Sequence, residues 1–150
     1  MMECKEEGAL TSTMEDYLEA VWSIEDRDRV PRVKDVSELM NVTPPTVNSA
    51  MKCLKKRGLI EQENYGYIKL TDEGRRIAVH VRKRHELFRR FFEEVLKLDT
   101  KTAEKDACRV EHNVSPATVQ RIVDFLDFIC STSEGRKPEW LSAFHSGFAD

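Results

Sequence analysis

Hydrophobic residues recur at helical spacing through the first part of the chain. Apolar positions three and four residues apart follow hydroxyl side chains that can cap a helix, which predicts a helix from about 11 to 26. A shorter helix is predicted over 33–40, and we expect it to bury Val36, Leu39 and Met40.

A third helix is predicted over 43–57, with its first residue as the cap. Pro44 suits the start of this helix, where a missing N–H costs no hydrogen bond. Val47, Met51 and Leu54 are spaced to share one face and are therefore expected in the core.

A hairpin is predicted after the third helix. Residues 59–62 and 67–70 alternate between apolar and polar side chains and flank a turn over 63–66. The order helix, short helix, break, helix, hairpin is typical of a winged helix-turn-helix, in which one helix enters the major groove of DNA. The helix over 43–57 is the expected recognition helix.

The second half of the chain is helical in pattern, with wide apolar stripes. Helices are expected over 71–96, from 100 or 102 to near 112, and from 116 onward. A turn and a short docked helix are expected after 131. These helices carry more apolar surface than one small wing domain can cover, so we expect a homodimer, whose two-fold symmetry matches palindromic double-stranded operator DNA.

The charge distribution supports DNA binding although the net charge of −3 does not. Residues 51–90 hold 12 Lys and Arg against 5 Asp and Glu, a local net of +7 in an otherwise acidic chain. Such a segment is typical of a surface that meets phosphate, although a solvated helix face or a protein-interaction domain would also carry it. The residues expected to contact DNA are Arg32, Lys34, Thr43, Pro44, Pro45, Thr46, Asn48, Ser49, Lys52 and Lys56.

Nothing in the sequence points to a membrane or to export. No apolar run approaches the roughly 18 residues of a membrane span, and the first residues lack the basic-then-apolar order of a secretory signal. We therefore expect a cytoplasmic protein with no membrane partner. Its four cysteines form no C-x-x-C pair and are expected to be reduced thiols.

Side chains that ligate metals recur three or four residues apart, so that they share helix faces. The candidates are Asp16 and Glu19 on the first predicted helix, His85 on the long helix, and Cys108, Glu111 and His112 on the helix after it. Each cluster alone has a plainer interpretation, because a half-buried His is often satisfied by a hydrogen bond and a buried Cys is usually a small hydrophobe. Zinc-finger spacing is absent, and mixed oxygen and nitrogen donors with one sulfur favour Mn²⁺ or Fe²⁺.

Five segments form a recognisable series along the chain. They are Met14–Ala20, Arg32–Val36, Leu70–Arg75, Arg84–Leu87 and Ala107–His112. Together and in this order they resemble the diphtheria-toxin-repressor (DtxR/MntR) family of metal-dependent transcriptional repressors. The resemblance extends from about Thr11 to Cys130 and is closer to the shorter manganese-regulator type.

The resemblance implies a mainly α fold in two domains. An N-terminal winged helix-turn-helix, with three helices and a β-hairpin wing, is expected over 1–74. An all-helical metal-binding and dimerisation domain is expected over 75–150, with 71–96 as the linking helix.

The resemblance also implies that all six candidate side chains are metal ligands. Asp16 follows the manganese type and Cys108 follows the iron type, so the implied site is a hybrid. The cognate cation is left between Mn²⁺ and Fe²⁺, with one or two ions per subunit and Zn²⁺ possible in vitro. Arg89 and Glu104 stand at positions of the iron-type accessory site, which is therefore expected to be absent or altered.

The implied function is a dimeric repressor of metal-uptake genes, with the metal as corepressor. An ion that needs ligands from both domains would favour the DNA-binding arrangement. We expect neither an enzyme nor a small-molecule substrate. The alternatives are a redox sensor with Cys108 as an oxidisable thiol beside His112, a metal-independent winged-helix regulator, and a metalloenzyme, for which no general base is evident.

Overall fold

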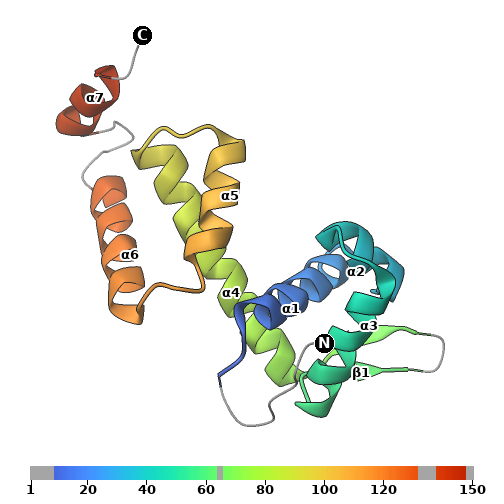
Figure 1. Cartoon of the computed structure of the whole chain (residues 1–150). Helices are drawn as coiled ribbons and strands as arrows, with labels where there is room; N and C mark the ends of the chain where they lie inside the picture. Colours follow the sequence, from blue (N-terminus) through green and yellow to red (C-terminus); the bar gives the residue numbers. More distant parts are fainter. Residues whose placement is uncertain (1–8, 64–65, 132–137, 148–150) are drawn as a thin grey trace. The chain divides into compact units, whose positions relative to one another are not determined.

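The structure of the protein is a computed structural model that describes residues 9–63, 66–131 and 138–147. The chain divides into two compact units, 1–82 and 83–150. Helices dominate both units, and Figure 1 shows them coloured along the sequence. The mainly α fold predicted from the sequence is confirmed. The domain boundary placed after residue 74 stays a prediction.

The first unit has the element order that the hydrophobic pattern predicts. Its elements are α1 (Ser12–Glu25), α2 (Val33–Met40), α3 (Pro44–Lys56), β1 (Ile60–Gln62), β2 (Ile68–Leu70) and the first part of α4 (Asp72–Arg90). β1 and β2 pair antiparallel, with Ile60 opposite Leu70. Asn64 and Tyr65 of the predicted turn lie outside the described residues. This arrangement is a winged helix-turn-helix.

Apolar side chains from α1, α2, α3 and the hairpin form the core of this unit. Val47, Met51 and Leu54 of α3 are fully buried, as predicted. Burying each such side chain contributes about 1.5–3 kcal/mol. The prediction for Leu39 is wrong, because its residue surface is 49% exposed. The inner face of α2 runs through Val36, and Leu39 lies beside that face.

Hydroxyl side chains act at two helix starts, in different ways. The Thr43 hydroxyl makes no capping bond to the α3 backbone and instead lies 2.9 Å from the Thr46 hydroxyl. The Thr71 hydroxyl accepts a hydrogen bond from the backbone N–H of Gly74 and donates one to the carbonyl of Gly58. Thr71 therefore joins the first turn of α4 to the end of the preceding helix.

The second unit is helical. It contains the last part of α4, the π-helix η1 (Phe91–Val95), α5 (Thr100–Val110), α6 (Pro116–Ser131) and α7 (Glu139–Ser146). Val95, Leu126 and Leu141 form its buried core. The predicted helix to about residue 96 is confirmed in extent, but its last turn is a π-helix. His145 Nε2 lies 2.9 Å from the carbonyl oxygen of Val95, which ties α7 to η1.

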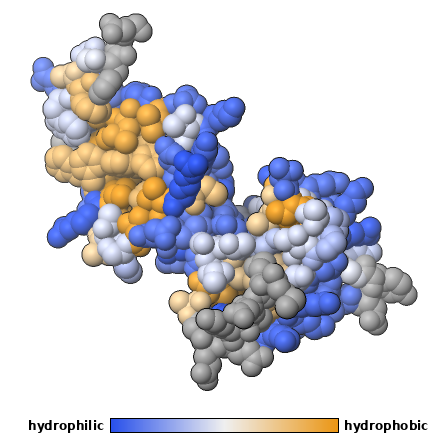
Figure 2. All heavy atoms as spheres, in the orientation of Figure 1, coloured by the Kyte–Doolittle hydropathy of each residue, from blue (hydrophilic) through white to orange (hydrophobic). Residues whose placement is uncertain are grey.

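Large apolar side chains remain on the surface of the second unit. Phe128 is 55% exposed, and Trp140 and Phe144 are also exposed. Figure 2 shows apolar side chains gathered over the helices of this unit. Exposed aromatic groups of this size are typical of an interaction surface. Among the described residues, no helix has the length and apolar character to cross a bilayer.

Two of the four cysteines are seen as free thiols. They are Cys108 and Cys130. Cys53 is buried in α3, and Cys4 lies outside the described residues. That all four cysteines are reduced stays a prediction.

Candidate metal centre and nucleic-acid surface

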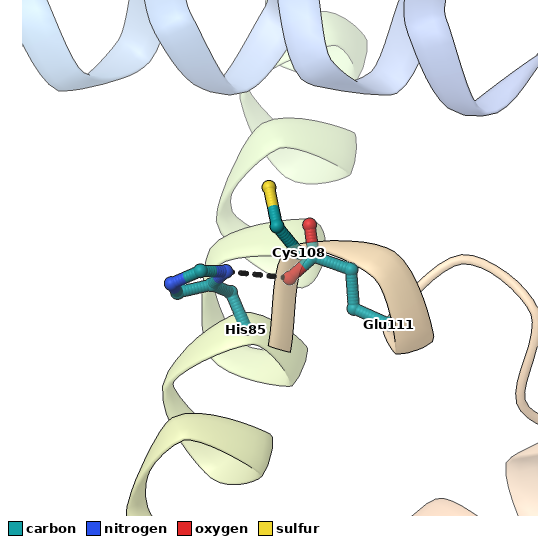
Figure 3. A group of neighbouring side chains, drawn as sticks. All are labelled: His85, Cys108 and Glu111. Carbon is teal, nitrogen blue, oxygen red and sulfur yellow. Dashed lines mark hydrogen bonds and ion pairs between the residues drawn. The ribbon is translucent and has the colours of Figure 1, made fainter. Parts of the chain in front are cut away.

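Three predicted ligands come together in the second unit (Figure 3). His85 lies on α4, Cys108 lies on α5, and Glu111 caps the C-terminal end of α5. One ligand atom from each side chain lies within 4.8 Å of the others. Cys108 and Glu111 are three residues apart, so one helical turn places both near His85.

The contact between His85 and Glu111 is a buried ion pair. Nδ1 of His85 donates to Oε2 of Glu111 over 2.8 Å, and the side chains are 3% and 0% exposed. A carboxylate withdrawn from water in this way is tolerated only when a cation or hydrogen-bond donors compensate for its lost hydration. Glu111 therefore needs a cation or a hydrogen-bond donor beside it.

In the protein without metal, that partner is the His85 imidazolium. A hydrogen bond with Cys108 and a second one with Glu111 raise the pKa of His85 to about 10, although burial opposes them. The ring is therefore protonated near neutral pH. A metal ion that binds Nδ1 must displace this proton, so a metal ion and a proton compete for this nitrogen.

One buried oxygen atom indicates that the residues fit a metal ion. Oε1 of Glu111 has no well-aligned hydrogen-bond partner among the described residues. A second imidazole lies close, since Oε1 of Glu111 is 3.1 Å from Nε2 of His112. A buried acceptor without an aligned donor costs about 1–3 kcal/mol, which coordination to a cation would recover. Imidazole, thiolate and carboxylate together suit a divalent transition metal.

The remaining predicted ligands are placed as follows. His112 is partly buried and directly follows Glu111. Asp16 and Glu19 are partly buried on α1 of the first unit, where the carboxylate of Glu19 lies 3.4 Å from the Arg82 guanidinium. The ligand role of each of these residues stays a prediction.

The residues predicted to contact DNA are all exposed on the first unit. They are Arg32, Lys34, Thr43, Pro44, Pro45, Thr46, Asn48, Ser49, Lys52 and Lys56. Most belong to α3 or its cap, on the faces that Val47 and the other core residues leave exposed. Lys55 and Lys56 lie in the last turn of α3, so their charge complements the carbonyl end of the helix dipole.

Sequence reasoning missed the partner of Arg32. Its Nη2 donates to the hydroxyl of Tyr67 over 3.0 Å, and the guanidinium carbon lies 4.8 Å from the centre of the Tyr67 ring. Arg32 and Tyr67 also form an isolated backbone bridge beside the hairpin. The wing therefore holds Arg32 in place, and no pattern in the sequence links two residues this far apart.

A depression of about 1110 Å³ lies elsewhere on the first unit, between the end of α1, the α1–α2 connection and the hairpin. Acidic and basic side chains line it, among them Asp28, Asp35, Arg32 and Lys69. None of the six candidate ligands borders it, so this depression is separate from the metal centre.

Two known protein families match consecutive parts of the chain. The family described as iron dependent repressor, N-terminal DNA binding domain, matches residues 9–68. The family described as iron dependent repressor, metal binding and dimerisation domain, matches residues 71–139. The two matches together cover most of the chain.

Individual relatives are similar at about 30% identity. A helix-turn-helix transcriptional regulator of Methanocaldococcus jannaschii is 31% identical over 79% of this chain and 95% of its own length. The regulator MntR of Bacillus velezensis is 30% identical over 88% of this chain and 92% of its own length. The diphtheria toxin repressor of Corynebacterium efficiens is 29% identical, and the chain spans only 55% of its length. Among solved structures, the manganese regulator SloR matches with a TM-score of 0.71 and 28% identity, over 79% of this chain and 55% of SloR.

Proposed function

Because the chain belongs to the diphtheria-toxin-repressor (DtxR/MntR) family of metal-dependent transcriptional repressors, we propose that it represses transcription when it binds Mn²⁺ or Fe²⁺. Family members combine a DNA-binding domain with a metal-binding and dimerisation domain. The observation that carries the proposal is the meeting of His85, Cys108 and Glu111 in a chain whose other unit is a winged helix-turn-helix.

The proposed ligand set has a core of three residues and three further members. His85, Cys108 and Glu111 supply the core, and His112 extends it because its imidazole lies against Glu111. Asp16 and Glu19 complete the set, which rests on their match to family ligand positions. The oxygen and nitrogen donors suit Mn²⁺ or Fe²⁺, and the thiolate explains why Zn²⁺ is expected to bind in vitro.

The regulatory step is a change of protonation and charge within the protein. His85, Cys108 and Glu111 would hold a divalent cation, which would supply positive charge to the carboxylates around it. To bind it, His85 would give up the proton on Nδ1, Cys108 would bind as a thiolate, and Glu111 would bind as a carboxylate. Asp16 and Glu19 belong to the DNA-reading unit, so their participation would couple that unit to the state of the second unit. The DNA-binding arrangement then has the higher metal affinity.

On DNA, α3 is proposed to read base edges with its exposed polar residues while its lysines contact phosphates. Asn48 offers an amide suited to adenine, and Lys52 offers a charge without sequence preference. We propose a homodimer on a palindromic operator in the cytoplasm, with its apolar helices as the subunit contact. No catalytic step is proposed for any residue.

The experiment is a DNA-binding titration on a duplex selected from a random pool in the presence of Mn²⁺. Fluorescence anisotropy of the full chain is measured with Mn²⁺, with Fe²⁺ under anaerobic conditions, and with EDTA. Tight binding that EDTA abolishes is expected. His85→Ala should remove the metal response, whereas His80→Ala should keep it because His80 is exposed on the same helix.

Two outcomes would contradict the proposal. Equal DNA affinity in EDTA and in Mn²⁺ would leave a metal-independent regulator. Binding that survives EDTA but is lost on treatment with peroxide would favour a redox sensor based on Cys108.

A further inference from the structure

Glu104 is a carboxylate beside the metal centre that lies outside the proposed ligand set. It stands on α5 one turn before Cys108, and its side chain is 54% exposed. Its Oε1 lies 3.1 Å from Nε2 of the buried His85. His85 therefore has a carboxylate at each ring nitrogen, Glu111 at Nδ1 and Glu104 at Nε2.

The two nitrogens of His85 face different surroundings. Figure 3 shows the nitrogen bonded to Glu111 directed toward the Cys108 and Glu111 side chains, with the other nitrogen on the far side of the ring. A neutral imidazole that binds a metal through one nitrogen carries its proton on the other. Glu104 lies where this remaining N–H needs a hydrogen-bond acceptor.

We propose that Glu104 is a positioning residue that accepts the Nε2–H of His85 and so holds Nδ1 toward the cation. This inference rests on the proposed metal site. Carboxylates that accept the second N–H of a metal-bound histidine fix its tautomer and ring orientation and raise its basicity. The 3.1 Å contact lacks good hydrogen-bond alignment without metal, and a small rotation of the half-exposed Glu104 side chain would improve it.

The test compares Glu104→Gln with Asp106→Asn in the full chain. Asp106 is a matched control, because it lies on the same helix and its carboxylate is 3.9 Å from Arg109, away from the site. Mn²⁺ affinity is measured from the EPR signal of free Mn²⁺. Nitrogen-15 NMR of the Zn²⁺-loaded protein reports which His85 nitrogen carries the proton.

We expect Glu104→Gln to weaken Mn²⁺ binding about 10-fold or more, as loss of such a carboxylate does elsewhere. The number of bound ions and the melting temperature of the metal-free protein should stay the same. The Nε2–H proton of His85 should exchange faster with water. Asp106→Asn should leave all of these readouts unchanged.

Two results would overturn the inference alone. Mn²⁺ affinity and His85 signals that are the same in both variants would show that Glu104 does not position the ring. A loss of one bound ion on Glu104→Gln would make Glu104 a ligand. If the wild-type protein bound no Mn²⁺ at all, the proposed metal site itself would fail, and that failure is distinguishable from the other two.

Discussion

At the scale of single residues, Cys108 is the proposed ligand that most affects which cations the candidate centre would prefer. It is the only sulfur among the proposed ligands, and its thiol is free. Soft thiolate donors favour Zn²⁺ over Mn²⁺, whereas carboxylates favour the harder Mn²⁺. The hybrid donor set therefore predicts a protein that binds Zn²⁺ readily even if another cation is its physiological effector.

Replacing Cys108 should shift this preference. We expect Cys108→Asp to lower the ratio of Zn²⁺ to Mn²⁺ affinity by roughly tenfold, about 1.4 kcal/mol. Competition against a chelator of known affinity measures both constants. Cys130→Ser is the control, since Cys130 is the other free thiol among the described residues. An unchanged ratio in Cys108→Asp would place the sulfur outside the coordination sphere.

A second residue, Asp99, controls the start of α5. Its carboxylate accepts from the hydroxyl of Thr102 over 2.6 Å and from the Thr102 backbone N–H over 3.1 Å. These bonds, the hydroxyl bond first, lower the pKa of Asp99. Its stabilising effect is therefore fully present above pH 3.8, its ordinary value, and is lost as the pH falls through the lower folded value.

The predicted pH dependence follows from that sign. At pH 7, Asp99→Ala should lower the melting temperature by a few degrees, because α5 loses its N-cap. The difference from wild type should shrink as the pH is lowered below 3.8. Melting curves by circular dichroism at several pH values measure it. A difference that grows in acid would mean that another group is responsible.

At the scale of elements, Gly74 sets how closely α4 approaches the hairpin. A Cβ atom at Gly74 would lie 2.0 Å from the backbone oxygen of Leu59. Backbone cannot move away as a flexible side chain can, so α4 and the start of β1 depend on the absence of a side chain here. From the sequence, Gly74 can be placed in the first turn of a helix, but its contact with the backbone of Leu59 cannot be predicted.

Gly74→Ala should therefore destabilise the first unit. Overpacking against backbone costs about 1–3 kcal/mol, which more than offsets the gain in helix propensity. Gly147→Ala is a suitable control, since its Cβ would lie 3.4 Å from the nearest backbone oxygen. Denaturant unfolding measures both changes. A fully stable Gly74→Ala variant would show that the contact relaxes without cost.

Local pattern predicted the elements well and their contacts poorly. Period and capping residues placed α1, α2 and α3 within a residue or two, because the core face of each helix repeats along the sequence. Leu39 was misplaced because a two-turn helix leaves more than one choice of inner face. Spacing also put Cys108 and Glu111 on one turn. The meeting of Glu104 with His85 was not predicted, because a contact between separate helices has no period.

At the scale of the whole molecule, the central claim is that metal binding and DNA binding favour the same state. Four candidate ligands lie in the second unit, whereas Asp16, Glu19 and the proposed recognition helix lie in the first. The charge pattern predicted a DNA-binding surface, because a basic segment lies inside an otherwise acidic chain. Coupling between the two functions is a free energy, and it must be the same whichever ligand is added first.

The Mn²⁺ affinity of the full chain, measured with and without saturating amounts of the selected duplex, tests this coupling most directly. DNA should tighten Mn²⁺ binding by the same factor by which Mn²⁺ tightens DNA binding, about 5–150-fold for typical coupled sites. A Mn²⁺ affinity that saturating duplex leaves unchanged would contradict the claim that this metal centre controls DNA binding.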